Sequence, residues 1–313
     1  MKILLLGCDG QVGWELQRSL QPLGEVLALD FQSRDYAADF SQPDALAATV
    51  DAVKPDLIVN AAAHTAVDKA ESEPALAQAI NADAPGVLAR AAAARGAWLV
   101  HYSTDYVFDG SGDQPRGEDA PTGPLSVYGR TKLDGENQIR ASGCKHLILR
   151  TSWVYAARGG NFAKTMLRLA AARTELNVID DQVGAPTGAD LLADLTALMA
   201  RAARTQPELA GTYHAVAAGA TSWHGYARLV IETARARGVP LTLPADALRA
   251  IPTSAYPTPA PRPLNSRLDT RKLRERFGVH LPDWESGVQR LFGLAGFSSR
   301  LIALPAASNS TTP

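Results

Sequence analysis

The chain has 313 residues, of which 46% are hydrophobic and 20% charged, and its formal net charge is -1. This composition is typical of a globular protein, and the length allows one large core or two smaller ones. A charge so close to neutral gives no electrostatic reason to expect nucleic acid or a membrane surface as a partner.

Cysteine usage and the first residues indicate a cytoplasmic protein. Cys8 and Cys144 are the only cysteines and have no metal-binding spacing, so we expect neither a disulfide framework nor a zinc site. The opening MKILLLGCDG contains an apolar run too short for a secretion signal or a membrane span. We therefore expect a soluble protein of the reducing cytoplasm.

Short apolar runs alternate with alanine-rich stretches through the first half of the chain. The runs predict strands at residues 2–6, 25–30, 56–62, 98–103 and 146–152, with helices between them at 11–21, 43–53, 74–95 and 127–141. Several runs are almost continuously apolar, as in strands covered on both faces. The alternation predicts an α/β fold with a Rossmann-like, doubly wound parallel sheet.

After residue 151 the pattern becomes less regular. Residues 181–192 resemble a loop leading into a helix, 211–216 a strand and 222–237 a helix, whereas the Pro-rich stretch 253–270 has the character of a binding loop. We predict an NAD(P)-binding domain over 1–155 and a smaller substrate-binding domain mainly over 156–300, some of whose segments return to the first domain. Residues 301–313 are expected to be a frayed tail.

A glycine turn follows the first predicted strand, with Gly7, Gly10 and Gly13 in the sequence GCDGQVG. Such a turn leaves the first helix amides free to bind an anion such as a pyrophosphate. Gly7 would permit the turn, Gly10 the close approach of a phosphate, and Gly13 the packing of helix on sheet. The motif predicts a dinucleotide cofactor.

Asp30 ends the second predicted strand, where a carboxylate can bind the adenosine ribose hydroxyls. It would repel a 2′-phosphate, and Arg34 would partly offset that repulsion. The alternative is that Asp30 is only a solvated strand end. Both NADH and NADPH therefore remain open as the cofactor.

The third predicted strand leads into NAAAHTAVDKAESEP, whose small residues at 61–63 let a flat ligand lie against the backbone. His64 has two interpretations of equal weight, as a ligand contact and as a loop residue that caps the next helix. Asp68 and Glu71 are read as solvated acids at a helix start rather than as a catalytic pair.

The fourth predicted strand ends in HYSTDYVF, and the following helix begins with VYGRTK. Thr104, Tyr128 and Lys132 would then meet at the edge of the sheet that carries the glycine turn. A ketone reduced by hydride needs a proton as its alkoxide forms. A phenol with a pKa of ~10 can supply it, and a neighbouring cation lowers such a pKa by roughly 1–3 units. Tyr128 is the predicted acid, with Lys132 beside it.

These motifs, together with RTSWVY, DQVGAPT and SAYPTPAPRPLNSRLDT, resemble the dTDP-4-dehydrorhamnose reductase family of the extended short-chain dehydrogenases/reductases. The resemblance covers all but about the last twenty residues. It implies NAD(P)H-dependent reduction of the C4 ketone of dTDP-4-dehydro-L-rhamnose, in dTDP-rhamnose biosynthesis for cell-surface polysaccharide such as lipopolysaccharide.

The resemblance also assigns roles to residues. Tyr128, Lys132 and Thr104 are implied to be catalytic. Beside Gly7 and Gly13, cofactor contacts are implied at Asp9, Gly10, Gln11, Val12, Asp30, Asp39, Phe40, Ala63, His64, Thr65, Tyr102, Tyr128 and Lys132. The implied substrate contacts are Thr104, Asp105, Trp153, Arg262 and Asn265. Without the family, Trp153 would be read as a core residue.

Some members of the family bind Mg²⁺ through carboxylates at a homodimer interface. Glu15 and Asp190 stand at matching positions here, the second shortened from glutamate. The third carboxylate would fall near residues 293–294, where the sequence has none. Since Mg²⁺ prefers several oxygen ligands, the sequence leaves both the metal and that dimer in doubt.

Two other functions fit the same fold. A sugar-nucleotide dehydratase or epimerase is one, although dehydratases resembling this fold have a glutamate where this chain has Tyr106. The other is a non-catalytic nucleotide-binding regulatory subunit, against which the intact Thr104, Tyr128 and Lys132 argue.

Overall fold

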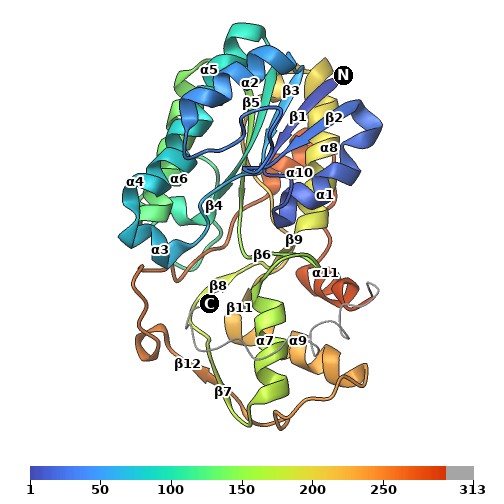
Figure 1. Ribbon diagram of the computed structural model, residues 1–313. Helices are drawn as coiled ribbons and strands as arrows, with labels where there is room; N and C mark the ends of the chain where they lie inside the picture. Colours follow the sequence, from blue (N-terminus) through green and yellow to red (C-terminus); the bar gives the residue numbers. More distant parts are fainter. Residues whose placement is uncertain (294–313) are drawn as a thin grey trace.

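The structure is a computed structural model that describes residues 1–293 (Figure 1). The frayed tail predicted for residues 301–313 lies outside these described residues. An upper part, which holds the N-terminus, is built around a parallel sheet, and a lower part consists of helices and short strands. None of the helices within residues 1–293 combines the length and the apolar character needed to cross a bilayer.

Six parallel strands form the main sheet in the order β10-β5-β4-β3-β1-β2. They are β1 (Lys2–Leu6), β2 (Glu25–Leu29), β3 (Leu57–Asn60), β4 (Trp98–Thr104), β5 (Lys145–Thr151) and β10 (Gly211–His214). The five strands predicted in the first half all form, with ends that differ by at most two residues. The predicted α/β class with a parallel sheet is confirmed.

The strand order reverses at β1, because β2 and β3 pair with opposite edges of that strand. In open parallel sheets, ligands bind beyond the carboxyl ends of the strands at such a reversal. The carboxyl ends of β1 and β3 carry the glycine turn and the small residues 61–63, so the predicted cofactor motifs lie at this point.

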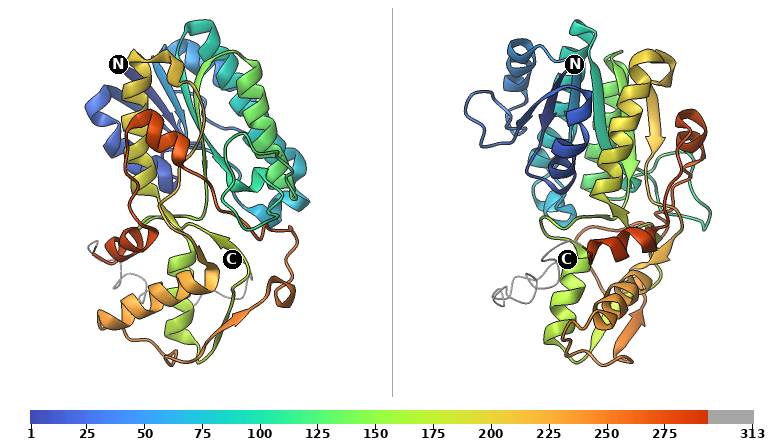
Figure 2. Two further views of the ribbon diagram at one scale, coloured as in Figure 1. Left: turned by 180° about the vertical axis from the view of Figure 1, so that it is seen from behind. Right: turned by 90° about the vertical axis from the view of Figure 1, so that its right-hand side faces the viewer.

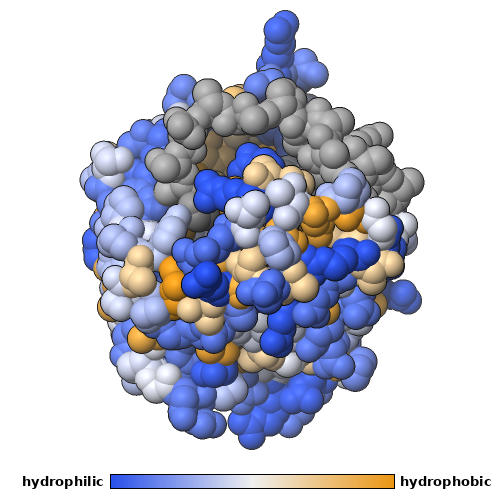
Figure 3. Space-filling model, turned by 90° about the horizontal axis from the view of Figure 1, so that it is seen from below, coloured by the Kyte–Doolittle hydropathy of each residue, from blue (hydrophilic) through white to orange (hydrophobic). Residues whose placement is uncertain are grey.

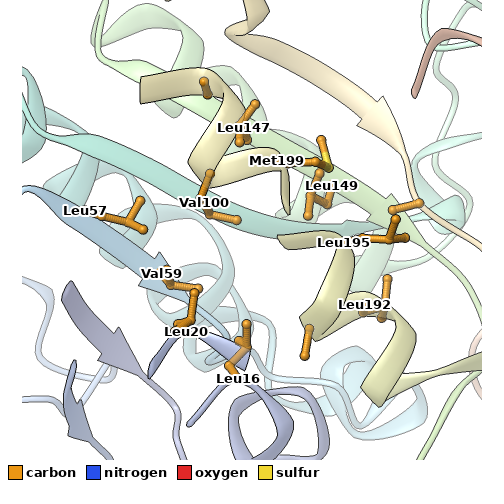
Figure 4. Close-up of a cluster of buried hydrophobic side chains, with 14 of the residues drawn as sticks. Leu16, Leu20, Leu57, Val59, Val100, Leu147, Leu149, Leu192, Leu195 and Met199 are labelled. Carbon is orange, nitrogen blue, oxygen red and sulfur yellow. The ribbon is translucent and has the colours of Figure 1, made fainter. Parts of the chain in front are cut away.

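Each face of the sheet is covered by helices, because alternate residues of a strand point to opposite sides. Ile3 and Leu5 of β1 pack beneath α1 (Gln11–Ser19), α8 (Ala189–Thr205) and α10 (Arg271–Phe277). Leu4 and Leu6 pack beneath α2 (Pro43–Val53), α5 (Ala84–Arg95) and α6 (Val127–Ala141). Figure 2 shows α8 and α10 on the side opposite to α5 and α6. Figure 4 shows the first of these clusters, in which Leu192, Leu195 and Met199 of α8 face the strands.

The helix predicted over residues 74–95 is interrupted. It forms as α4 (Pro74–Gln78), a π turn labelled η2 (Ala79–Asp83), and α5. Pro85 lacks an amide hydrogen, so the regular hydrogen-bond ladder cannot pass through its position. The interruption places the buried Asn81 against α6, where Gly135 leaves room for its backbone. Single π turns of this kind often occur at functional sites.

The lower part has its own core. It contains α7 (Phe162–Ala172), α9 (Trp223–Ala236) and α11 (Trp284–Leu291). Its short strand pairs are β6 (Val154–Tyr155) with β9 (Thr187–Gly188), β7 (Leu176–Ile179) with β12 (Leu248–Ile251), and β8 (Val183–Gly184) with β11 (Thr221–Ser222). Tyr226 and Trp284 are buried there. Seen from below, small apolar groups are scattered among polar ones on the part of this face that is not drawn grey (Figure 3), as on most protein surfaces.

The chain crosses between the two parts more than once. The predicted strand at 211–216 forms β10 and pairs in parallel with β5 at the edge of the upper sheet. Helices α8 and α10 also pack on that sheet. We propose a division into two domains in which β10, α8 and α10 belong to the first domain, although they follow residue 155 in the sequence.

Candidate active site

The turn between β1 and α1 is shaped by its three glycines. Gly7 has a left-handed φ of +80°, and a Cβ on it would lie 2.6 Å from the backbone nitrogen of Ala62. A Cβ on Gly13 would collide with the carbonyl oxygen of Gly7. Gly10 precedes α1 and supplies no side-chain cap, while Val12 packs against the core. The first amides of α1 are therefore suited to hold a phosphate of a dinucleotide.

Asp30 follows the last residue of β2 and lies beside this turn. Its Oδ1 accepts hydrogen bonds from the Gln32 amide at 2.8 Å and from the Ser33 hydroxyl at 3.3 Å. The Asp9 side chain, and then the bonds from residues 32 and 33, hold the pKa of Asp30 below its ordinary value. Asp30 is thus a charged group at the place where a ribose would lie.

Asp39 and Phe40 lie in the connection from β2 to α2. The Asp39 carboxylate accepts hydrogen bonds from the amide and the hydroxyl of Ser41, at 2.9 and 2.7 Å. The Phe40 side chain is buried in the core on the α2 side of the sheet. Any contact of Phe40 with a cofactor must therefore come from its backbone.

Ala63, His64 and Thr65 form the loop after β3, and the side chain of Asn81 fixes this loop. The Asn81 Oδ1 accepts from the His64 amide at 2.9 Å, and its Nδ2 donates to the His64 carbonyl at 3.1 Å. The His64 imidazole lies 3.5 Å from the Glu73 carboxylate. His64 does not cap a helix, since the N-cap of α3 (Val67–Ser72) is Ala66.

A loop of the lower part, residues 158–161, lies against the glycine turn. The Arg158 guanidinium forms an ion pair with Asp9 at 3.0 Å and lies over the Trp14 ring, 4.1 Å from its centre. The Asn161 side chain donates to the Gln11 side-chain carbonyl at 3.1 Å. Side chains of the lower part therefore contact the predicted phosphate site.

Thr104 and Tyr128 meet at the carboxyl end of β4. Thr104 is the last residue of the strand, and Tyr128 stands in the first turn of α6, whose N-cap Ser126 accepts from the Gly129 amide at 3.1 Å. The two side chains lie next to each other. Burial, the largest cause, raises the pKa of Tyr128 to about 12, while the neighbouring Thr104 acts in the opposite direction. Tyr128 is therefore a protonated phenol at neutral pH.

Lys132 lies one turn further along α6 and is buried. Its Nζ donates to the Tyr102 carbonyl oxygen at 2.6 Å and lies 3.1 Å from Nε2 of His101. Burial lowers the pKa of Lys132 to about 8. Burial is the largest cause acting on the pKa of Tyr128, followed by Thr104 and Asp105, so the lowering of that pKa by Lys132 stays a prediction.

Tyr102 was expected to contact the cofactor. Its backbone carbonyl holds Lys132, whereas its hydroxyl makes a short hydrogen bond, 2.5 Å, to Thr196 of α8. The phenol therefore points to the helix on the opposite face of the sheet. Any role of Tyr102 at the cofactor would act through its backbone and Lys132.

Two buried polar residues next to Lys132, Asn60 and His101, were not predicted from the sequence to lie at the site. Asn60 ends β3, and its side chain lies 3.0 Å from Nδ1 of His101 in β4. Both side chains are buried. The signal was present in the sequence, since a histidine and an asparagine interrupt two otherwise apolar strands.

Asp105 and Tyr106 follow Thr104 in a short 3-10 turn, η3 (Asp105–Val107). The Thr104 hydroxyl donates to Asp105 Oδ1 at 3.1 Å. Burial, the largest cause, raises the pKa of Asp105 to about 6, against the neighbouring side chains of Ser266 and Thr104. The Tyr106 ring packs edge-on against Tyr128, with centres 5.4 Å apart. The position after Asp105 therefore carries no carboxylate for proton abstraction.

Trp153 is half-buried and has an unusual backbone, with a left-handed φ of +50°. Its ring stacks on Trp223 of α9 at 3.6 Å between centres, and a Cβ on Gly184 would lie 2.8 Å from it. A bulky residue in this conformation is strained and is often found at a functional site. Trp223 packs on one face of the Trp153 ring. The interpretation of Trp153 as a core residue therefore holds for that face.

The Pro-rich segment meets α3 through an ion pair. Arg262 contacts Asp68, whose side chain, like that of Arg262, is 15% exposed. The expectation that Asp68 is a solvated acid is therefore wrong, because the fold brings a distant arginine to it. Glu71, also read as solvated, accepts a hydrogen bond from the Val127 amide at 2.7 Å, and that expectation is likewise wrong.

Asn265 was expected to contact the substrate, and the structure gives it another role. It is buried, and its Nδ2 donates to the Gln114 carbonyl at 2.9 Å. Its Oδ1 accepts from the Arg267 amide at 3.2 Å. Because these contacts engage both ends of the amide, Asn265 fixes a loop and we do not retain it as a substrate contact.

Glu15 and Asp190 are neighbours, but they do not fit a Mg²⁺ site within this chain. Glu15 lies 3.9 Å from Arg18, and Asp190 lies 3.6 Å from Arg290. Burial and the charge of Asp190 raise the pKa of Glu15. Two carboxylates that each face an arginine are too few oxygen ligands for a hard cation. Residue 294, where part of the third ligand would fall, lies outside the described residues.

Comparison with known proteins gives a consistent result. The chain matches the RmlD substrate binding domain family over residues 1–295. It is 60% identical, over 291 residues, to the dTDP-4-dehydrorhamnose reductase of Escherichia coli (strain K12), and the match covers 93% of this chain and 97% of that protein.

Solved structures show the same relationship. The dTDP-4-dehydrorhamnose reductase from Clostridium acetobutylicum ATCC 824 matches with a TM-score of 0.84 and 36% identity, covering 94% of this chain and 99% of that one. The dTDP-4-dehydrorhamnose reductase from Bacillus anthracis, solved in complex with NADP, matches with a TM-score of 0.82 and 32% identity, covering 93% and 98%.

Proposed function

The chain belongs to the RmlD substrate binding domain family, and on that premise we propose that it is an NAD(P)H-dependent dTDP-4-dehydrorhamnose reductase. It would reduce the C4 ketone of dTDP-4-dehydro-L-rhamnose to give dTDP-L-rhamnose. Relatives at 50% and 60% identity carry that name, and a solved relative is in complex with NADP.

One observation carries the proposal most directly. The phenol of Tyr128 lies next to Thr104 at the carboxyl edge of the sheet, the same edge that holds the glycine turn. A proton donor, a hydroxyl partner and a phosphate cradle at one rim are the parts needed to reduce a ketone with a dinucleotide.

The glycine turn and the amides of α1 would hold the pyrophosphate, and Asp30 would hold a ribose. When bound, the dinucleotide supplies the hydride that adds to the ketone carbon. The loop that carries Arg158 and Asn161 covers the turn and would limit the access of water to the phosphates.

Tyr128 would protonate the oxygen as the hydride adds. The phenolic O–H bond breaks, a new O–H bond forms on the substrate, and a phenolate remains on Tyr128. Even with its pKa raised to about 12, the phenol is a stronger acid than the alcohol it produces, so the transfer is downhill. The Thr104 hydroxyl, whose hydrogen goes to Asp105 Oδ1 in this structure, would turn to donate to the ketone oxygen, orienting it and stabilising the developing charge.

The substrate would lie between the two domains. Asp105 and Thr104 stand on the upper side, and Trp153 stands at the start of the lower side with its ring held by Trp223. Arg262 stays a proposed substrate contact. Its Nη1 and Nη2 both donate to the Asp68 carboxylate.

Replacing Tyr128 by phenylalanine tests the proposal. We expect Tyr128→Phe to lower kcat by about 10²–10⁴-fold, because the proton donor is lost, while cofactor binding survives. The assay is NADPH or NADH oxidation, followed by absorbance with the dTDP-keto sugar, and binding is followed by fluorescence titration. The matched control is Tyr106→Phe, which removes the neighbouring hydroxyl. Full activity in Tyr128→Phe would contradict the assignment of Tyr128 as the proton donor.

A folded wild-type protein that oxidises neither cofactor with this sugar would instead favour the non-catalytic module. An epimerase retains its NAD, so tightly bound cofactor in the purified wild-type protein would favour that alternative.

A further inference from the structure

A series of three hydrogen bonds lies behind Trp153 in the lower part. The Trp223 indole Nε1 donates to Gln182 Oε1 at 3.1 Å, and Gln182 Nε2 donates to Thr253 Oγ1 at 3.1 Å. The Thr253 hydroxyl in turn donates to the Asp181 carboxylate at 2.6 Å. Gln182 is 3% exposed, so both ends of its amide make their bonds away from water.

The direction of each bond in this series follows from the groups that make it. An indole N–H can only donate, so the side-chain oxygen of Gln182 must face Trp223 and its NH₂ must face Thr253. The Thr253 oxygen accepts that bond, and its hydrogen goes to Asp181. No other orientation of the Gln182 amide satisfies both of its neighbours.

The pairing of β8 with β11 brings Gln182 opposite Trp223. In this antiparallel pair Val183 faces Ser222, so the next positions along it are Gln182 and Trp223. Ser222 is also the N-cap of α9, and it fixes where the chain leaves the strand and enters the helix. The bond from the indole Nε1 then fixes how the Trp223 ring is turned.

Trp223 supports Trp153. The two rings stack with centres 3.6 Å apart and planes 13° apart, which covers one face of the Trp153 ring. Gly184, at the end of β8, lies so close to this ring that a Cβ on it would be 2.8 Å away. Trp153 has a left-handed φ of +50°, a conformation that persists only where the surroundings hold it. The position of Trp153 therefore depends on Trp223 and on the strand that follows Gln182.

The stretch 181–183 also holds both ends of the Pro-rich segment. At the start of the segment, the Thr253 amide donates to the Asp181 carboxylate at 2.9 Å. Near the other end, the Val183 amide donates to the Leu264 carbonyl at 2.8 Å. Arg262, a proposed substrate contact, lies between these two attachments.

We propose that Gln182 is a positioning residue for the sugar nucleotide. Its side chain joins the support of Trp153 to the start of the Pro-rich segment, so that Trp153 and Arg262 face the same substrate. The inference rests on the proposed function, in which the substrate lies between the two domains. Gln182 acts through Trp223 and Thr253, because its own amide is buried and bonded at both ends.

The first test needs no substrate. In the full-length protein labelled with ¹⁵N-tryptophan, each indole N–H gives its own NMR signal, and Gln182→Leu removes the acceptor of one of them. We expect the signals of Trp223 and Trp153 to move together, since one ring rests on the other. The signals of Trp14 and Trp98 in the upper part should stay in place. A Trp153 signal that does not move would overturn the proposal.

The second test measures binding and kinetics. We expect Gln182→Leu to weaken the binding of dTDP alone, followed by calorimetry, and to raise KM for the dTDP-keto sugar, each by roughly 3- to 10-fold. We expect kcat to change by less than about twofold and the Kd for NADPH to stay unchanged, because the lost contacts serve substrate binding only. The control is Gln138→Leu, which removes an amide bonded to Asp83 in the upper part. Equal effects of the two variants on dTDP binding would contradict the proposal.

A third variant separates positioning from a simple loss of packing. Trp223→Phe keeps a ring under Trp153 but has no N–H, so it leaves Gln182 Oε1 without its donor. Replacing both partners of a buried hydrogen bond by apolar groups costs less than removing one of them. We therefore expect Gln182→Leu to weaken dTDP binding clearly less in the Trp223→Phe background than in the wild type. Equal weakening in the two backgrounds would contradict a role through Trp223.

If Gln182→Leu does not fold, Thr253→Val decides, because valine has the shape of threonine but cannot accept from Gln182. Its control is Thr242→Val, which removes a hydroxyl bonded to a backbone carbonyl elsewhere in the lower part. Weaker dTDP binding in Thr253→Val alone supports the proposal, and equal binding in both variants contradicts it. A wild-type protein that does not bind dTDP would contradict the proposed function. Equal dTDP binding by the wild type and by Gln182→Leu would contradict only this inference.

Discussion

The Arg262 guanidinium donates two parallel hydrogen bonds to the Asp68 carboxylate, from Nη1 to Oδ1 at 3.0 Å and from Nη2 to Oδ2 at 2.7 Å. The two residues are 194 positions apart in sequence. The bond joins the Pro-rich segment to α3, and a two-pronged arginine–carboxylate pair fixes orientation as well as distance. It therefore determines where the segment lies relative to the site.

We expect this pair to couple measurably in a double-mutant cycle. Asp68→Asn, Arg262→Gln and the double variant should give a coupling energy of about 0.5–3 kcal/mol, measured by chemical unfolding. The control cycle is Glu175→Gln with Arg249→Gln, an exposed pair at 3.2 Å that we expect to contribute about 0–1 kcal/mol. Equal couplings in the two cycles would contradict a structural role for the Asp68–Arg262 bond.

Asp30 should bias the enzyme against a 2′-phosphate. Its pKa is held below the ordinary value, so the carboxylate is charged at neutral pH and repels a second negative group. We expect Asp30→Ala to raise the ratio of kcat/KM for NADPH to that for NADH by roughly tenfold. Steady-state kinetics with both cofactors measure the ratio, and Asp35→Ala, an exposed acid in the same loop, is the control. An unchanged ratio of the two kcat/KM values would mean that the 2′-position of the cofactor ribose does not lie near Asp30.

The packing of α1 on the sheet should not tolerate a side chain at position 13. A Cβ there would collide with backbone at Gly7, which cannot move as a flexible side chain can. We expect Gly13→Ala to lower the free energy of unfolding by about 1–3 kcal/mol and to weaken cofactor binding. Gly160→Ala is the matched control, because nothing lies within 4 Å of a Cβ there. Similar losses in both variants would contradict this reading of the turn.

Asp105 should make stability depend on pH. Its pKa in the folded protein is about 6, above the ordinary 3.8, because burial disfavours the charge. Its contribution to stability is therefore complete below about pH 3.8 and is lost as pH rises through about 6. Asp105→Asn carries no such charge, so its stability relative to wild type should improve between pH 4 and pH 7, by up to about 3 kcal/mol. Unfolding curves at several pH values measure this, and a constant difference would contradict it.

Most elements of the upper part could be predicted from the sequence because the signals for them are local. The helices predicted at 43–53 and 127–141 form with those bounds, and the glycine turn falls where the motif placed it. The helix at 74–95 was predicted to be continuous. Its interruption was not predicted, although Pro85, which causes it, is visible in the sequence. A proline shows where a helix is disturbed but not whether the chain stops or inserts a π turn.

The site was only partly predictable, for a different reason. Tyr128 and Lys132 are four residues apart on one helix, so their proximity follows from helical geometry. Their charges do not, since burial raises the pKa of Tyr128 and lowers that of Lys132. His101 was visible as a histidine in an apolar strand, but its partners, Asn60 and Lys132, come from other elements.

The sequence by itself determined the order of strands and helices and the residues at the strand ends, because hydrophobic period, glycine and proline act within a few residues of their own position. Only the tertiary structure decided which distant groups meet: β10 joining the edge of the sheet, Arg262 reaching Asp68, and Asn60, His101 and Lys132 lying in one buried row. Burial depends on the packing of separate elements, and it shifts the pKa values of Tyr128 and Lys132, which no local pattern in the sequence shows.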